Sequence, residues 1–177
     1  MLMIEIRLHG RGGQGAVTAA YLLAKTMFYE GWWVQAFPNF GVERRGAPVE
    51  SYVRIDKSRI KKYYNIHNPD MVIVLDPTLD NYASGIKKGG KAIVNTTKPV
   101  SIPDVEVHTI DVVPISKKVF NAPIFNTPML GAFLGATKLA DIVTLHKVMD
   151  EVWHGDIANK NKEASWLAYK EMVDKNA

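Results

Sequence analysis

The sequence contains no cysteine among its 177 residues. This absence excludes disulfides, a cysteine nucleophile, a cysteine-held zinc ion and a cysteine-ligated iron–sulfur cluster within the chain. The five histidines are scattered and show no metal-ligand spacing such as His-Glu-x-x-His. If the protein takes part in redox chemistry, the electron carriers must therefore sit on a bound cofactor or on another chain.

Long apolar runs and a strong charge excess are also missing. No stretch approaches the roughly 18 apolar residues that span a bilayer, and no N-terminal stretch resembles a secretory signal. The 22 basic and 18 acidic residues give a formal charge of +4, which is compatible with a phosphorylated ligand but too weak to indicate nucleic acid. With 47% apolar residues, we expect residues 1–177 to form one soluble, cytoplasmic domain.

The most informative segment is the glycine-rich run His-Gly-Arg-Gly-Gly-Gln-Gly at 9–15. Such a run can turn tightly and present backbone N–H groups to an anion at the start of a helix. Gly10, Gly12 and Gly15 also satisfy the G-x-G-x-x-G spacing of dinucleotide-binding folds. The run therefore predicts a phosphate-binding turn.

The periodicity around this run predicts an α/β fold. Apolar residues alternate over 3–8, recur at helical spacing from Ala16 until Gly31, and form a strand over 32–37, which indicates a parallel, Rossmann-like β-α-β unit. We expect a three-layer α/β/α architecture with a mostly parallel sheet. Further strands are predicted over 49–55, 71–75, 91–95 and 105–110, a short helix over 79–86, and C-terminal helices that include 129–139, with Thr127, Thr144 and Asn161 as caps.

The second feature of a dinucleotide-binding fold, an acid after the second strand, is missing. A dinucleotide fold usually ends its second strand with an acid that binds the ribose, whereas this strand ends Gln-Ala-Phe-Pro at 35–38, and the next acid is Glu43. Arg44 and Arg45 could instead meet a 2′-phosphate, which leaves an NADP-linked or flavin-linked reductase as one alternative. A glycine turn that binds nothing, in a purely structural subunit, is another.

Three groups of side chains suit an anionic ligand. Arg11 is flanked by glycines and fits a phosphate clamp better than a solvated cation. Arg44 and Arg45 lie in a loop that should line the ligand crevice at a strand end. Gln14 can either cap the helix or turn its amide to a ligand, whereas the basic stretch at 57–62 is typical of a solvated turn.

No nucleophile, base and orienting residue are spaced to form a catalytic set. The chain therefore resembles a binding domain that contributes to a shared active site rather than a complete enzyme.

Several motifs together resemble a known family. The chain is similar to the gamma subunit of 2-oxoacid:ferredoxin oxidoreductases, the pyruvate-type enzymes, over essentially its whole length. The matching segments are His-Gly-Arg-Gly-Gly-Gln-Gly-Ala-Val-Thr-Ala-Ala at 9–20, Gln-Ala-Phe-Pro at 35–38, Gly-Val-Glu-Arg-Arg-Gly-Ala-Pro at 41–48, Val-Arg-Ile-Asp at 53–56, Asn-Pro-Asp at 68–70, Val-Leu-Asp-Pro at 74–77, Asn-Thr at 126–127, Leu-Gly-Ala at 130–132 and Asn161.

The resemblance implies a role in a multi-subunit enzyme. Such enzymes decarboxylate a 2-oxoacid on thiamine diphosphate and Mg²⁺, pass electrons through [4Fe-4S] clusters to ferredoxin, and transfer the acyl group to coenzyme A. Thiamine diphosphate and the clusters lie on other chains, of alpha, beta and delta type, while the gamma chain is associated with coenzyme A binding and with closing the active site.

On this resemblance, we expect one constellation to bind coenzyme A phosphates. Gly12, Gly13, Gln14 and Gly15 would cradle the phosphates with N–H groups. Arg11, Arg44 and Arg45 would neutralise their charge, and Asn126 would close the pocket by hydrogen bonding.

Overall fold

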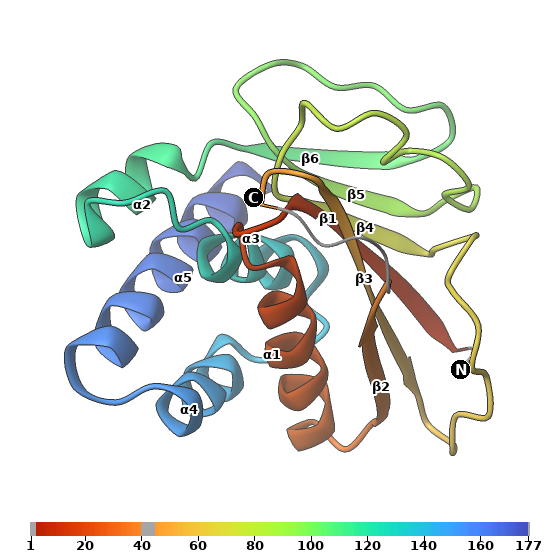
Figure 1. Ribbon diagram of the computed structural model, residues 1–177, viewed down its shortest axis with the longest axis horizontal. Helices are drawn as coiled ribbons and strands as arrows, with labels where there is room; N and C mark the ends of the chain where they lie inside the picture. Colours follow the sequence, from red (N-terminus) through yellow and green to blue (C-terminus); the bar gives the residue numbers. More distant parts are fainter. Residues whose placement is uncertain (1–2, 40–44, 177) are drawn as a thin grey trace.

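The computed structural model describes residues 3–39 and 45–176 and contains a six-stranded sheet with five helices (Figure 1). The α/β class and the mostly parallel sheet predicted from the periodicity are confirmed. In chain order the elements are β1 (Ile4–Arg11), α1 (Ala16–Tyr29), β2 (Trp33–Pro38), β3 (Pro48–Asp56), β4 (Met71–Val74), β5 (Lys91–Asn95), β6 (Glu106–Ile110), α2 (Val113–Phe120), α3 (Asn126–Thr137), α4 (Ile142–Val152) and α5 (Gly155–Lys175).

The strand order is β2-β3-β1-β4-β5-β6, and it corrects one expectation about the first β-α-β unit. β3 lies between β1 and β2 and pairs antiparallel with both. β1 and β2 therefore run in the same direction without being neighbours. On its other side β1 pairs parallel with β4, and β4, β5 and β6 continue the sheet in parallel.

The helices cover one face of the sheet (Figure 1). Their side chains form the main core with the inward residues of the strands, among them Ile6, Leu8, Ile73 and Ile93, all fully buried. α3 is buried on almost every side because it is enclosed between the sheet and α5. This packing accounts for most of the apolar surface that the fold removes from water.

The opposite face is covered by irregular segments rather than by helices. Its apolar part is small, with Val72, Val74, Ala92 and Val94 at its centre. The predicted short helix over 79–86 is a series of turns in the structure. Among the described residues, turns and loops therefore take the place of the second helical layer that the α/β/α expectation includes (Figure 1).

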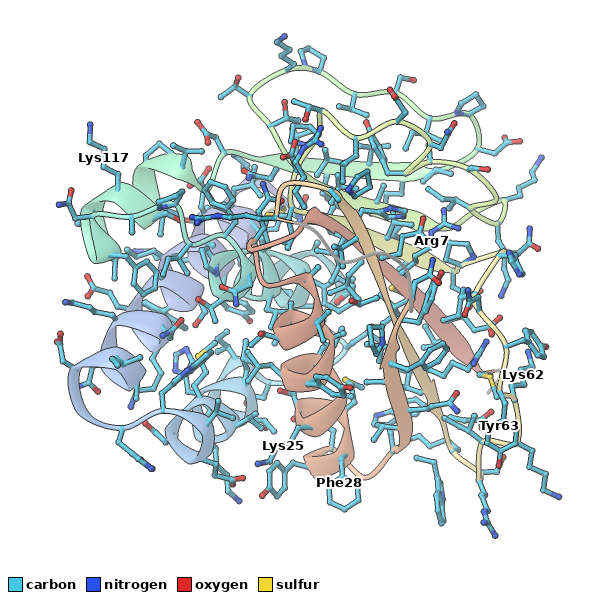
Figure 2. The ribbon with its side chains drawn as sticks, viewed as in Figure 1. Arg7, Lys25, Phe28, Lys62, Tyr63 and Lys117 are labelled. Atoms are coloured by element: carbon cyan, nitrogen blue, oxygen red, sulfur yellow. The ribbon has the colours of Figure 1, made fainter. Side chains whose placement is uncertain are left out.

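Buried arginines hold these irregular segments against the sheet. Arg54 is fully buried and donates to Glu5 Oε1 at 2.8 Å and to the Tyr64 carbonyl. Figure 2 shows Arg7 on the side of the sheet away from α1, where its guanidinium donates to the carbonyls of Tyr82 and Ser84.

All three predicted helix caps are wrong. Thr127 and Asn161 lie inside α3 and α5, where the Thr127 hydroxyl donates to Asn161 Oδ1 at 2.8 Å and joins the two helices. α4 is capped by Asp141, whose carboxylate accepts from the Val143 N–H, so Thr144 lies within the first turn. The short helix α2 was not predicted. Among the described residues, no helix is both long and apolar enough to cross a membrane.

Candidate functional site

The glycine-rich turn joins the end of β1 to the start of α1. β1 runs through Arg11, which pairs with Pro48 at the start of β3. The Gly12 N–H then donates to the Ala47 carbonyl at 2.8 Å, and the Gly46 N–H returns a bond to the Gly12 carbonyl at 3.0 Å. These bonds fix the turn against the segment that carries Arg45.

The N-terminus of α1 presents unsatisfied backbone donors. Its N-cap is Gly15, in the left-handed region at φ 79°, so no side chain caps the helix, and its first turn contains no acidic residue. The N–H groups of Ala16, Val17 and Thr18 therefore have no intrahelical partner. Together with the helix dipole, they favour a negatively charged ligand.

A cleft of about 590 Å³ opens directly in front of this helix end. Backbone donors, two cations and a small apolar surface meet in it. Its walls are Arg11, Gly12, Gly13, Gly15, Ala16, Val17, Thr18, Arg45 and Val49.

Arg11 already has protein partners for all three of its guanidinium nitrogens. Nε donates to Asp76 Oδ2 at 3.1 Å, one terminal nitrogen to the Gly46 carbonyl at 3.2 Å, and the other to Thr78 Oγ1 at 2.9 Å. A carboxylate thus offsets its charge. Arg45, by contrast, is exposed at the mouth of the cleft.

Gln14 faces the other side of the turn. Its Oε1 accepts from the Arg11 N–H at 2.7 Å, and its Nε2 donates to Asp76 Oδ2 at 2.9 Å. It lines a second, smaller cleft of about 300 Å³ at the carboxyl ends of β4 and β5.

Asp76 is the centre of this arrangement. Burial raises its pKa, but hydrogen bonds from Thr78 and Gln14 and the positive charge of Arg11 outweigh burial and hold the pKa below its ordinary value. Asp76 is therefore a carboxylate at neutral pH, and it contributes negative charge on the β4 side of the turn.

The Asn126 side chain lies next to Gly15, at the end of the turn. A Cβ on Gly15 would lie 2.6 Å from Asn126 Nδ2, and Asn126 Oδ1 accepts from the N–H of Thr127 at 3.0 Å. Asn126 is not among the residues that line the larger cleft.

The structure thus brings five of the predicted site residues to one cleft, namely Arg11, Gly12, Gly13, Gly15 and Arg45. Gln14 and Asn126 adjoin the turn without lining that cleft. Arg44 lies outside the described residues.

Sequence reasoning missed Asp76 as a neighbour of the glycine turn. The available signal was its position directly after β4, because parallel strands bring their carboxyl ends to one edge of the sheet.

The dinucleotide interpretation loses its geometric basis. The ribose-binding acid of such folds follows the parallel strand beside β1, but here β3 occupies that place and runs antiparallel. Within residues 3–39 and 45–176, no three His, Asp or Glu side chains are grouped to hold a metal ion.

Comparisons with known proteins give the relationship of the chain. The model of the family "Pyruvate ferredoxin/flavodoxin oxidoreductase" matches residues 5–171. Pyruvate synthase subunit PorC of Methanothermobacter thermautotrophicus is 50% identical over 173 residues, covering 96% of both chains. The pyruvate/ketoisovalerate oxidoreductases common subunit gamma of Thermococcus litoralis is 42% identical, covering 97% of this chain and 98% of that one.

A solved structure agrees with these sequence matches. The pyruvate oxidoreductase subunit PORC of Thermotoga maritima superposes with a TM-score of 0.85 at 31% identity, covering 96% of this chain and 97% of that one. The chain belongs to the pyruvate ferredoxin/flavodoxin oxidoreductase family, in which it corresponds to the gamma subunit.

Proposed function

We propose that the cleft in front of α1 binds phosphate groups of coenzyme A within an assembled 2-oxoacid:ferredoxin oxidoreductase, with pyruvate as the favoured 2-oxoacid. The observation that carries the proposal is the convergence, on one cleft of about 590 Å³, of the uncapped α1 N-terminus, the Gly13 backbone and Arg45. The Gly12 N–H is already bound to the Ala47 carbonyl. Coenzyme A carries a pyrophosphate and a 3′-phosphate, so it offers more than one anion to these donors.

A distant structural relative is consistent with this ligand. The 2-oxoglutarate:ferredoxin oxidoreductase of Magnetococcus marinus, solved with 2-oxoglutarate, coenzyme A and succinyl-CoA bound, has a TM-score of 0.79 at 19% identity. The match covers 99% of this chain and 32% of that one, so it establishes a common fold. We infer from that fold only that a coenzyme A site can be built beside it.

The remaining chemistry belongs to partner chains in this proposal. Thiamine diphosphate with Mg²⁺ supplies carbanion stabilisation for decarboxylation, and [4Fe-4S] clusters supply single-electron transfer to ferredoxin. A chain without cysteine cannot provide cluster thiolates. We therefore propose alpha, beta and delta-type subunits as its partners. This chain would hold coenzyme A by its phosphates and orient it toward the shared centre.

Replacing Arg45 with alanine tests the proposal. In the assembled enzyme we expect Arg45→Ala to raise the KM for coenzyme A about tenfold, near the lower end for a charged hydrogen bond, because Arg45 is exposed. Ferredoxin reduction by the 2-oxoacid in a first turnover without coenzyme A should be unchanged. Steady-state and single-turnover kinetics measure the two quantities.

Arg59→Ala is the matched control, because Arg59 is also exposed but lies after β3, outside the cleft. If Arg45→Ala and Arg59→Ala leave the KM for coenzyme A equally unchanged, Arg45 does not bind it. A series of Gly12, Gly13 and Thr18 variants with the same null result would favour a purely structural subunit.

A further inference from the structure

One point at the edge of the sheet links the two sides of the glycine turn. β1 and β4 are parallel neighbours with His9 opposite Val74, so the turn after β1 and the segment after β4 leave the sheet side by side. The chain connections diverge here, with β3 on one side of β1 and β4 on the other. In open α/β sheets, ligands bind at such a switch point.

Here a protein carboxylate occupies that point. Asp76 Oδ2 accepts from Arg11 Nε and Gln14 Nε2, while Oδ1 accepts from the N–H of Thr78 at 3.0 Å and from its hydroxyl at 2.6 Å. Four donors thus converge on one side chain. Both carboxylate oxygens of Asp76 are therefore occupied by hydrogen bonds from the protein.

The contacts form a closed ring around the turn. Asp76 holds the Gln14 amide, the Gln14 oxygen holds the Arg11 N–H, and the Arg11 side chain returns to Asp76. The Gln14 N–H adds a bond to the Arg11 carbonyl at 2.9 Å. Residues 11–14 are therefore fixed at both ends by one carboxylate.

The ring also reaches the neighbouring segment. The Arg11 guanidinium donates to the Gly46 carbonyl, next to Arg45. Asp76 itself is not among the residues that line the larger cleft. Asp76 therefore does not contact a ligand there, and it acts on one through Arg11, through the turn and through its negative charge.

We propose that Asp76 is the positioning residue of the anion site. It holds the glycine turn in its anion-binding shape and keeps the Arg11 guanidinium bound to protein groups rather than to the ligand. The cleft is then lined by preorganised backbone N–H groups, and Arg45 is its exposed cation. This inference rests on the proposed coenzyme A function for its kinetic consequence, but its structural consequence stands without it.

The structural consequence is tested by backbone hydrogen exchange on the chain. In Asp76→Asn one oxygen is replaced by a donor amide and the charge is lost, so the turn should open more often. We expect the amides of Arg11, Gly12 and Gln14, which donate hydrogen bonds within or beside the turn, to exchange about tenfold faster, with β5 and α5 unchanged. Asp80→Asn is the matched control, since Asp80 is exposed and four residues away.

A second variant guards against a general loss of folding. Gln14→Ala breaks the same ring from the other side while leaving Asp76 intact, and it should accelerate exchange over the same residues. Because the two residues share the Gln14–Asp76 hydrogen bond, the double variant should accelerate exchange by clearly less than the product of the two single effects. Additive effects, or exchange at wild-type rate in Asp76→Asn, would overturn the positioning role.

The kinetic consequence is read in the assembled enzyme with coenzyme A as the probe. Asp76→Asn should raise the KM for coenzyme A roughly tenfold or more while kcat stays within a factor of about two. A fall in kcat at unchanged KM, with faster exchange, would overturn the inference for this ligand. Faster exchange with unchanged KM in both Asp76→Asn and Arg45→Ala would instead reject the proposed coenzyme A site.

Discussion

Gly15 occupies a position where any side chain would meet two separate obstacles. Its φ of 79° lies in the left-handed region, which costs an L-residue roughly 1–2 kcal/mol. Its missing Cβ also leaves room for the Asn126 amide. Gly13 shares the first obstacle, with φ 95°, but a Cβ added there would have no atom within 4 Å.

Substitutions at Gly13 and Gly15 therefore distinguish the cost of backbone strain from the cost of a steric contact. We expect Gly13→Ala to lower the free energy of unfolding by about 1 kcal/mol through backbone strain alone. Gly15→Ala should lower it by roughly 1 kcal/mol more, because Asn126 must give up its bond to the Thr127 N–H to move aside. Denaturant unfolding of both variants measures the difference. Equal losses of unfolding free energy in the two variants would show that Asn126 moves aside without an energetic cost.

The residues of the turn illustrate what a sequence can and cannot predict. Glycines at 10, 12, 13 and 15 predict a tight turn, and the structure places Gly13 and Gly15 in the left-handed region that few other residues tolerate. The partner of the turn, Asp76, is 65 residues from Arg11, and no local pattern encodes that contact. The turn was therefore predicted from its own segment, whereas its contact with Asp76 was not.

At the scale of elements, α3 and α5 approach so closely that their backbones touch. A Cβ on Gly131 would lie 1.9 Å from the Ser165 carbonyl oxygen, and one on Gly135 would lie 2.8 Å from that of Tyr169. Backbone cannot move aside as a flexible side chain can. The two glycines therefore set the distance between the helices.

Gly131→Ala should consequently be severe. Overpacking costs about 1–3 kcal/mol and occasionally more, and a contact with backbone belongs at the upper end, so we expect the melting temperature to fall by roughly 6–12 °C. Asn159→Ala, exposed on α5, is the control and should leave the melting temperature nearly unchanged. Thermal melts followed by circular dichroism compare them. A Gly131→Ala protein as stable as the control would show that α5 is free to shift.

The elements that local periodicity marks strongly were predicted well. The apolar runs of β4 and β5 and the helical stripe of α1 appear in the structure within one or two residues of their expected bounds. The 8-residue helix α2 was missed because two turns carry little periodic signal. The insertion of β3 between β1 and β2 escaped prediction since strand pairing depends on contacts far apart in sequence.

At the scale of the whole molecule, one face of the sheet is apolar under helices and part of the other is polar under loops. The alternation in 4–8 places Glu5 and Arg7 opposite the main core, as expected, yet both are buried. Loop carbonyls take the place of water around the arginines: Arg7 donates to the carbonyls of Tyr82 and Ser84, and Arg54 donates to that of Tyr64. Local patterning cannot predict burial by a loop.

His9 makes the stability of this polar layer depend on pH. Arg7 Nε donates to His9 Nε2 at 2.8 Å, so that nitrogen must be an unprotonated acceptor, while Nδ1 faces Glu50 at 3.6 Å. Burial and the charge of Arg7 outweigh Glu50 and lower the pKa of His9 from 6.5 to about 4. The native state therefore keeps His9 neutral, whereas the unfolded state takes up a proton below pH 6.5.

The unfolded state binds more protons between pH 6.5 and 4, so the free energy of unfolding should fall on acidification through that range, by up to about 3 kcal/mol from His9. His9→Gln should remove much of this slope, and His154→Gln, at an exposed position, should retain it. Burial also lowers the pKa of His146, so a smaller slope of the same sign should remain. Denaturant unfolding at pH 7 and pH 5 gives the slopes, and an unaltered slope in His9→Gln would contradict the assignment.

The central place of β1 has a consequence for how the chain acquires its fold during synthesis. β1 pairs with β3 and β4, which begin at residues 48 and 71, while β2 and β3 form a hairpin of their own. Once residues up to Asp56 have left the ribosome, all three strands of this half of the sheet are available to pair. β1 nevertheless keeps one bare edge until β4 emerges, and such an edge is a template for pairing with other chains. Ribosome pausing in this interval would therefore favour aggregation, and faster elongation across it would protect the product.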